Sequence, residues 1–175
     1  MKAKRTLAAI FLISVTFLIV SCARQEEPPQ QVHLAWEKIT DQVSGKSDYS
    51  YEDVPRLKVI TSPSNVQSLS GQVYPEVLEQ VQSVDFSKFF VIVVFQGQQD
   101  TTGYFVEVTN VELREGTVFV YANFNEPSPG DVVGETLTSP YYILKVRKTE
   151  GVTGSPTFVL IANGEEVIRQ TYVIP

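Results

Sequence analysis

The chain has 175 residues, of which 43% are hydrophobic and 11% aromatic, enough for one domain with a core of its own. Fourteen Lys and Arg against twenty Asp and Glu give a net charge of -6, which argues against a nucleic-acid partner because phosphate contacts need clustered cations. One Cys and one His exclude an intrachain disulfide, a cysteine-based zinc site and a multi-histidine metal site.

Residues 1–21 read as a bacterial lipoprotein signal peptide. Lys2, Lys4 and Arg5 precede an uncharged stretch from residue 7 to residue 20, which is short for a membrane span. The stretch ends in Leu-Ile-Val-Ser-Cys, which resembles a lipobox, and this resemblance implies that Cys22 is lipidated and becomes the new N-terminus. The alternative is an ordinary secretory signal in which the Cys is incidental.

Cleavage before Cys22 would remove three cations and no acid, so the mature net charge would be -9. An acidic protein is repelled by anionic headgroups, and acyl chains on Cys22 would have to hold it at the membrane. We therefore expect a location in the bacterial cell envelope. Ala23 after the Cys favours the outer membrane if the cell has one; otherwise we expect the outer face of the cytoplasmic membrane.

A flexible tether is expected over residues 22–31, because this stretch is polar, carries two prolines and has no apolar side chain to bury after Ala23. No second linker or internal repeat follows, so residues 32–175 are expected to form a single β-rich domain.

The first predicted elements of the domain are a strand over residues 33–39, with Leu34, Trp36 and Ile39 pointing inward, and a strand over residues 56–60. Two short helices are expected next. Pro63 and Pro75 each suit the first helical turn, and Val66, Leu69, Val77, Leu78 and Val81 supply the apolar faces.

The remaining predicted elements are strands. Residues 89–95 are a continuous apolar run typical of a central strand, whereas residues 103–112 alternate, with positions 104, 106 and 108 on one face. Glu115-Gly116 and Asn163-Gly164 are hairpin signals. The other strands are expected over residues 118–122, 141–146, 157–162 and 166–173.

About eight strands and two short helices predict a mainly β fold, an antiparallel sandwich or partly open barrel, with the helical segment 63–82 covering one end. The alternative class is α+β.

No catalytic set is visible. The carboxylate pairs lie in loops or on adjacent strand positions that face opposite ways, Asp100 to Gly103 offers too few oxygens for calcium, and His33 stands alone at the start of the domain. We therefore expect no catalytic residue, no metal, no cofactor and no enzymatic activity. Tyrosines in or beside loops form a candidate interaction surface, with core packing as the alternative: Tyr49, Tyr51, Tyr74, Tyr141 and Tyr142.

A series of motifs between residues 85 and 147 resembles the C-terminal domain of the PrcB family. The series contains the strand VIVVFQG, the turn TTGY, a strand closed by PSPG, and the PYYILKV strand. The motif residues are Gly103, Tyr104, Pro127, Gly130, Pro140 and Tyr141, which turn geometry and core packing explain at least as well as binding. Thr102 departs from the Gly that the family often has before Gly103.

The resemblance implies a non-catalytic subunit of a secreted, subtilisin-like protease complex. The leading hypothesis is thus a surface lipoprotein that binds and stabilises another exported protein, with a protease as the partner implied. The alternative is a lipoprotein that binds a small ligand or substrate on a concave surface lined by Tyr and Phe.

Overall fold

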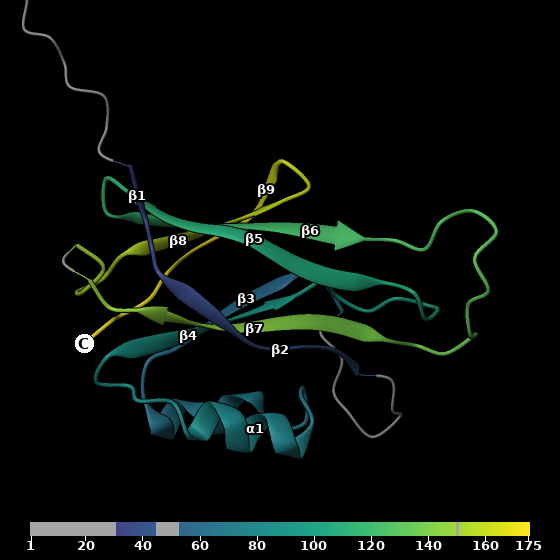
Figure 1. Ribbon diagram of the computed structural model, residues 1–175, viewed down its shortest axis with the longest axis horizontal. Coiled ribbons are helices and arrows are strands. Elements are labelled where there is room, and N and C mark those ends of the chain that lie inside the picture. Colours follow the sequence, from purple (N-terminus) through teal and green to yellow (C-terminus); the bar gives the residue numbers. More distant parts are fainter. Residues whose placement is uncertain (1–30, 45–52, 150) are drawn as a thin grey trace, which may run out of the picture.

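The computed structural model describes residues 31–44, 53–149 and 151–175, which fold into two sheets stacked face to face, with a helical layer outside one of them (Figure 1). The first sheet has five strands in the order β1-β5-β6-β8-β9. Their bounds are Gln31–His33 for β1, Phe105–Arg114 for β5, Thr117–Asn125 for β6, Thr157–Ala162 for β8 and Glu165–Thr171 for β9. All neighbours are antiparallel except β6 and β8, which are parallel.

The second sheet has four antiparallel strands in the order β2-β7-β4-β3. Their bounds are Trp36–Ser44 for β2, Arg56–Ile60 for β3, Phe89–Phe95 for β4 and Ser139–Arg147 for β7. The apolar run of β4 lies between β3 and β7 and is buried from Phe90 to Phe95. The prediction of a central strand buried on both faces is confirmed.

A helical layer covers the outer face of the four-stranded sheet. It consists of the 3-10 helix η1 (Pro63–Leu69) and the helix α1 (Pro75–Gln82), each beginning with a proline as predicted. Their buried side chains pack against the outward side chains of β4 and β7, such as Val93 and Ile143. The helical segment therefore covers a sheet face and not one end of the sandwich, which corrects the expected position. Neither helix of the described residues has the length and apolarity of a membrane span.

The core proper lies between the sheets, where Phe90 of β4 meets Phe158 of β8 edge to face at 5.8 Å between ring centroids. Val106, Val108 and Val120 face the same layer from the five-stranded sheet. The described residues thus form nine strands in a sandwich-like arrangement with two short helices and no closed barrel. The predicted mainly β class is confirmed.

The strand predicted over residues 33–39 is two strands in different sheets. β1 ends at His33 and pairs with β5, whereas β2 begins at Trp36 and pairs with β7. Between them, Leu34 N–H donates to Val111 O at 2.9 Å in one sheet and Arg147 N–H donates to Ala35 O at 2.9 Å in the other. The chain therefore crosses between the layers here, and β1 begins one residue inside the predicted tether.

Both predicted hairpin turns have the backbone that their residues favour. Glu115 and Gly116 have φ of 48° and 74°, and Asn163 and Gly164 have φ of 52° and 87°. Two successive residues with positive φ are the mark of a tight turn whose twist matches the flanking strands. These turns set the register of β5 with β6 and of β8 with β9.

Candidate functional site

Two loops project together from one end of the sandwich (Figure 1). Residues 97–104 follow β4 and residues 126–138 follow β6; we call them the loop pair. Gln99 and Thr138 exchange two backbone hydrogen bonds, each 2.8 Å, and Thr102 N–H donates to Gly134 O at 3.0 Å. The Thr102 hydroxyl accepts a further bond from Gly134 N–H at 2.8 Å. The two loops are therefore held as one unit with a defined shape.

Gly103 makes the closest contact between the two loops. Its φ is 98°, and a Cβ at this position would lie 3.0 Å from Pro127 Cβ and 3.2 Å from Val133 Cγ1. Only glycine combines this backbone angle with so close an approach. Two of the PrcB-like motif residues, Gly103 and Pro127, thus meet in space because each loop packs on the other.

Gly130 has another reason to be glycine. It has the same φ of 98°, but a Cβ there would meet nothing within 4 Å. It lies in a turn in which Asp131 N–H donates to Ser128 O at 3.0 Å and Ser128 N–H donates to the Asp131 carboxylate at 2.7 Å. Gly130 therefore serves the turn alone, as the structural reading of the motif expects.

This pair of glycines gives a matched test of how tightly the loops pack. Gly130→Ala is expected to cost about 1–2 kcal/mol of the free energy of unfolding, because alanine is strained at positive φ. Gly103→Ala has the same backbone cost plus the clash with Pro127, and we expect a loss about 1 kcal/mol larger. Urea unfolding of both variants measures the difference. Equal losses would show that the loops do not pack as described.

Exposed apolar side chains gather around the loop pair. Val132 is fully exposed at its tip, and Leu137 and Phe105 are 44% and 51% exposed. Val54, also about half exposed, lies beside Gly97 at the base, where its backbone carbon is 3.0 Å from the position of a Cβ. Four of the seven exposed large apolar residues of the described chain are therefore at this end. Such grouping marks interaction surfaces more often than single exposed residues do.

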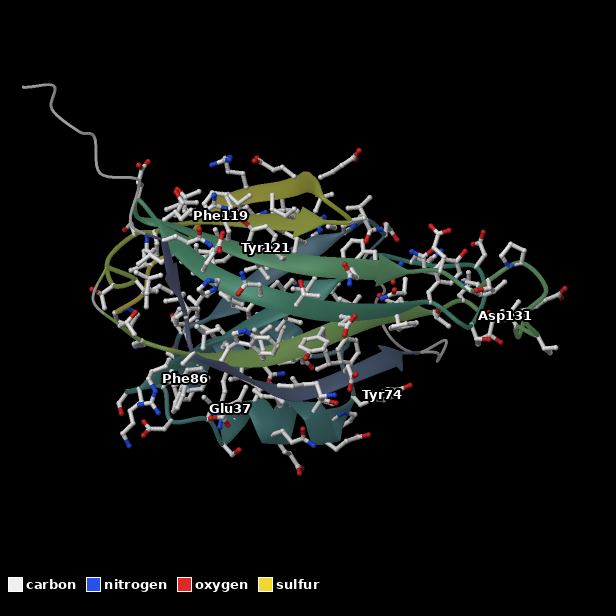
Figure 2. The ribbon with its side chains drawn as sticks, turned by 45° about the horizontal axis from the view of Figure 1, so that its top comes forward. Glu37, Tyr74, Phe86, Phe119, Tyr121 and Asp131 are labelled. Carbon is white, nitrogen blue, oxygen red and sulfur yellow. The ribbon has the colours of Figure 1, made fainter. Side chains whose placement is uncertain are left out.

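Carboxylates surround these apolar side chains. Six acidic residues at this end are exposed, and none is ion-paired within the described ranges: Asp53, Asp100, Glu107, Glu126, Asp131 and Glu135. Figure 2 shows Asp131 at the far end of the projecting loops. The loop pair therefore presents an apolar tip with an acidic rim.

Among the described residues, the tyrosines predicted as an interaction surface are buried or half-buried. Tyr141 and Tyr142 are only 1% and 7% exposed, because β7 is an inner strand covered by helices on one face and by the other sheet on the other. Their assignment to an exposed surface is corrected to core packing. Tyr74, just before α1, is half-buried and packs against the core cluster beneath the helices. Tyr49, Tyr51 and Cys22 lie outside the described residues.

The other motif residues are part of the framework beneath the loops. Pro140 is buried inside β7, which begins one residue before it, and its carbonyl accepts Gln96 N–H at 3.0 Å. Tyr104 is half-buried next to Gly103. These positions fix the path of the chain into and out of the loop pair, and sequence reasoning had not separated them from the exposed tip.

A buried carboxylate on the outer face of the five-stranded sheet had no counterpart among the predicted sites. Glu112 is 2% exposed; it accepts the Tyr121 hydroxyl at 2.6 Å, faces Arg114 at 2.6 Å and also accepts Gln31. Burial raises the pKa of Glu112, but the Tyr121 hydrogen bond and the Arg114 charge outweigh this effect and hold the pKa below its usual value.

This group ties three strands together on a sheet face that neither of the two described helices covers; Figure 2 shows Tyr121 and Phe119 there, on the side away from these helices. The Glu112 carboxylate, the Tyr121 hydroxyl and an Arg114 NH2 group bond each other, which favours a structural role; Arg114 Nε is buried without a hydrogen-bond partner among the described residues. The sequence contained one signal of a buried carboxylate, since Glu112 lies between the apolar Val111 and Leu113.

A depression of about 430 Å³ opens between the end of α1 and the edge of the four-stranded sheet. Its lining has one aromatic ring, Phe89, together with charged side chains such as Lys145 and Asp85. This lining differs from the Tyr and Phe surface that the ligand-binding hypothesis requires. Among the residues that the structure describes, no group of three or more His, Cys, Asp or Glu side chains could hold a metal ion.

Residues 90–147 match the family described as PrcB C-terminal, which confirms the predicted resemblance over this segment. The matched segment runs from β4 to β7 and includes the whole loop pair. Neither a search of curated proteins nor a search of solved structures found a match for the chain.

Proposed function

We propose, from the PrcB C-terminal likeness of residues 90–147, that this chain is a non-catalytic lipoprotein that binds and stabilises another exported protein through the loop pair. The partner that the likeness favours is a subtilisin-like protease. The observation that carries the proposal is Val132, an apolar side chain fully exposed at the tip of loops that hydrogen bonds hold in place.

The energetics of association support this use of the loop pair. A protein interface loses free energy when flexible loops must be ordered on binding, and loops that are already cross-bonded avoid much of that loss. An apolar centre with a polar rim is also the usual anatomy of an interface. Val132 with Leu137 and Phe105 supplies the centre, and the carboxylates supply the rim.

The rim indicates the chemistry of the partner surface. Six carboxylates without ion pairs within the described ranges repel an acidic protein and attract a basic one. The proposed partner therefore has an apolar depression bordered by Lys or Arg side chains. Association with such a surface would slow as salt is added, because salt screens exposed charges.

The test is a crosslinking pull-down from intact cells with a tag after Pro175, followed by mass spectrometry. We expect one exported protein in near-equal amount, and a protease if the family likeness extends to the partner. That protein should be less abundant in cells lacking this chain. A bait recovered without any stoichiometric exported protein would contradict the proposal.

The proposed anchor has its own prediction. Cys22→Ser is expected to abolish incorporation of a fatty-acid analogue and to release the protein from membranes, because acyl chains are the only strong attachment proposed for an acidic domain. Metabolic labelling and membrane fractionation measure the two effects. Ser21→Ala keeps a small residue before Cys22 and serves as the control. Labelling that persists in Cys22→Ser would rule out lipidation at this residue.

In the proposed location the domain lies in the bacterial cell envelope, at the outer membrane if there is one and otherwise on the outer face of the cytoplasmic membrane. Residues 22–30 would then link the lipid to β1. At about 3.5 Å per extended residue, these nine residues reach about 30 Å from the bilayer at most.

A further inference from the structure

Charge is distributed unevenly along the long axis of the domain. The loop pair projects at one end, where the six exposed carboxylates lie, and Arg56 at the start of β3 is the one basic residue near them among those described. At the opposite end, where β4 begins and β5 and β7 finish, five cations gather: Lys88, Arg114, Lys145, Arg147 and Lys148. We call this the basic end.

Contacts in the structure tie the basic end together. Arg147 and Lys145 both lie over the Phe89 ring, at 5.2 and 5.1 Å from its centroid. Lys148 N–H donates to Lys88 O at 2.8 Å, and its ammonium group donates to Pro175 O at 3.0 Å. These cations therefore share one surface at the ends of β4 and β7.

Not all of these cations are neutralised. Lys88 pairs with Asp85, Arg114 with Glu112 and Lys145 with Glu37. Arg147 and Lys148, by contrast, have no ion pair with a side-chain carboxylate in the described ranges, and the Lys148 ammonium bonds only Pro175 O there. Counting exposed Glu115 as well, the side chains of the basic end are close to neutral in sum, with Arg147 and Lys148 not paired to a described side-chain carboxylate, whereas the loop end is strongly negative.

The chain enters the domain at the basic end. Gln31 pairs with Arg114, and four residues later Ala35 O accepts Arg147 N–H. Figure 1 shows β1 and the C-terminus at the end of the molecule opposite the loop between β6 and β7. Residues 1–30, which include Cys22, therefore connect to the domain at its basic end, close to Arg147.

We propose that the basic end docks on the anionic headgroups of the membrane that holds the anchor, so that the loop pair points away from the bilayer. This proposal rests on the lipid anchor of the proposed function. An anionic surface attracts Arg147 and Lys148, with roughly a fivefold gain in occupancy per cation, and repels the carboxylates of the loop pair. The charge asymmetry thus orients a domain that the tether alone would leave free to turn.

The test uses the full lipidated chain in vesicles. Because Cys22 is the one natural cysteine and acylation occupies its sulfur, an introduced cysteine is the single free thiol. A dye is placed through Ser155→Cys at the basic end or Val132→Cys at the loop tip, both exposed positions. Energy transfer to acceptor-labelled lipid is compared in phosphatidylcholine vesicles with and without 30% phosphatidylglycerol.

We expect higher transfer from position 155 than from position 132 in the anionic vesicles, with a gap that narrows in neutral vesicles and at about 1 M salt, where the screening length is about 3 Å. Arg147→Glu with Lys148→Glu should remove the gap. Arg56→Glu with Arg169→Glu reverses as many charges elsewhere and should leave it. Equal transfer from the two positions in anionic vesicles, or a gap that salt does not change, would overturn the orientation.

Flotation of the same samples separates the two claims. Protein that floats with the vesicles but shows equal transfer overturns the orientation and leaves the anchor and partner binding standing. Protein that does not float overturns the anchor, and the membrane orientation with it.

Discussion

Replacing Phe158 with alanine is expected to lower the free energy of unfolding by about 3–5 kcal/mol. Phe158 is fully buried in β8 and meets two other rings edge to face, Phe90 at 5.8 Å and Tyr172 at 5.5 Å between centroids. Phe90 belongs to the other sheet, so the ring joins the two layers of the sandwich. Its removal would leave a cavity that two β-sheets, held by their hydrogen-bond ladders, cannot close.

The Phe158→Ala substitution is also expected to weaken the hydrogen bond that Tyr172 makes. Its hydroxyl donates to Leu57 O of β3 at 2.6 Å, and its ring is positioned by Phe158. Urea unfolding at pH 7 measures the change, with Phe105→Ala as the control. Phe105 is 51% exposed, and its truncation should stay within about 0.5 kcal/mol. A Phe158→Ala loss as small as that of the control would contradict the described core.

Glu112→Gln is expected to cost about 1.5–3 kcal/mol at pH 7, the range for hydrogen bonds that involve a charged group. The substitution keeps the size of the side chain but removes the charge that Arg114 faces at 2.6 Å and that the Tyr121 hydroxyl bonds at 2.6 Å. Glu107→Gln on the same strand is the control, since Glu107 is exposed and its replacement should be nearly neutral.

The pH dependence gives this prediction a sign. The folded-state pKa of Glu112 is below its usual value, so its charge stabilises the fold above the unfolded-state pKa of about 4.3. This contribution is lost as pH falls through the folded-state pKa. The difference between the native chain and Glu112→Gln should therefore be largest near pH 7 and shrink toward pH 3. A difference that stays constant or grows over this interval would contradict the network.

Local signals predicted most of the elements of this fold. Asn163-Gly164 and Glu115-Gly116 set hairpins because their residues tolerate positive φ. Pro63 and Pro75 begin helical turns because a missing N–H costs nothing there. The run from Phe89 to Phe95 had to be an inner strand, since no other position could bury it on both faces.

Relations between distant segments were not predictable in this way. Leu34 and Trp36 are spaced as in a single strand, although the chain passes from one sheet to the other between β1 and β2. The apolar pattern therefore gives no sign of the crossing. The parallel pairing of β6 with β8 depends on β7 lying in the other sheet. The position of the helices depends on which sheet face is left to cover, and neither feature has a local sequence signal.

The sequence predicted the residues that shape the loops of the candidate site but not the exposed residue at their tip. Gly103, Pro127 and Gly130 were identified as motif residues, and they do shape the loop pair. Tyr141 and Tyr142 were expected at a surface because they follow Pro140 near a loop, but β7 is inside the fold. Val132 has apolar chemistry and lies in a loop, and only the fold shows that its side chain is fully exposed.

The most direct measurement is site-specific photo-crosslinking in intact cells, with a photoreactive amino acid at position 132 or at position 167. Val167 is also an exposed valine, 42% accessible, but lies on the edge strand β9, which β8 separates from β6. If the loop pair binds the partner, the probe at 132 will form an adduct with one exported protein, and the probe at 167 will not. An adduct at 167 with none at 132 would contradict partner binding through the loop pair.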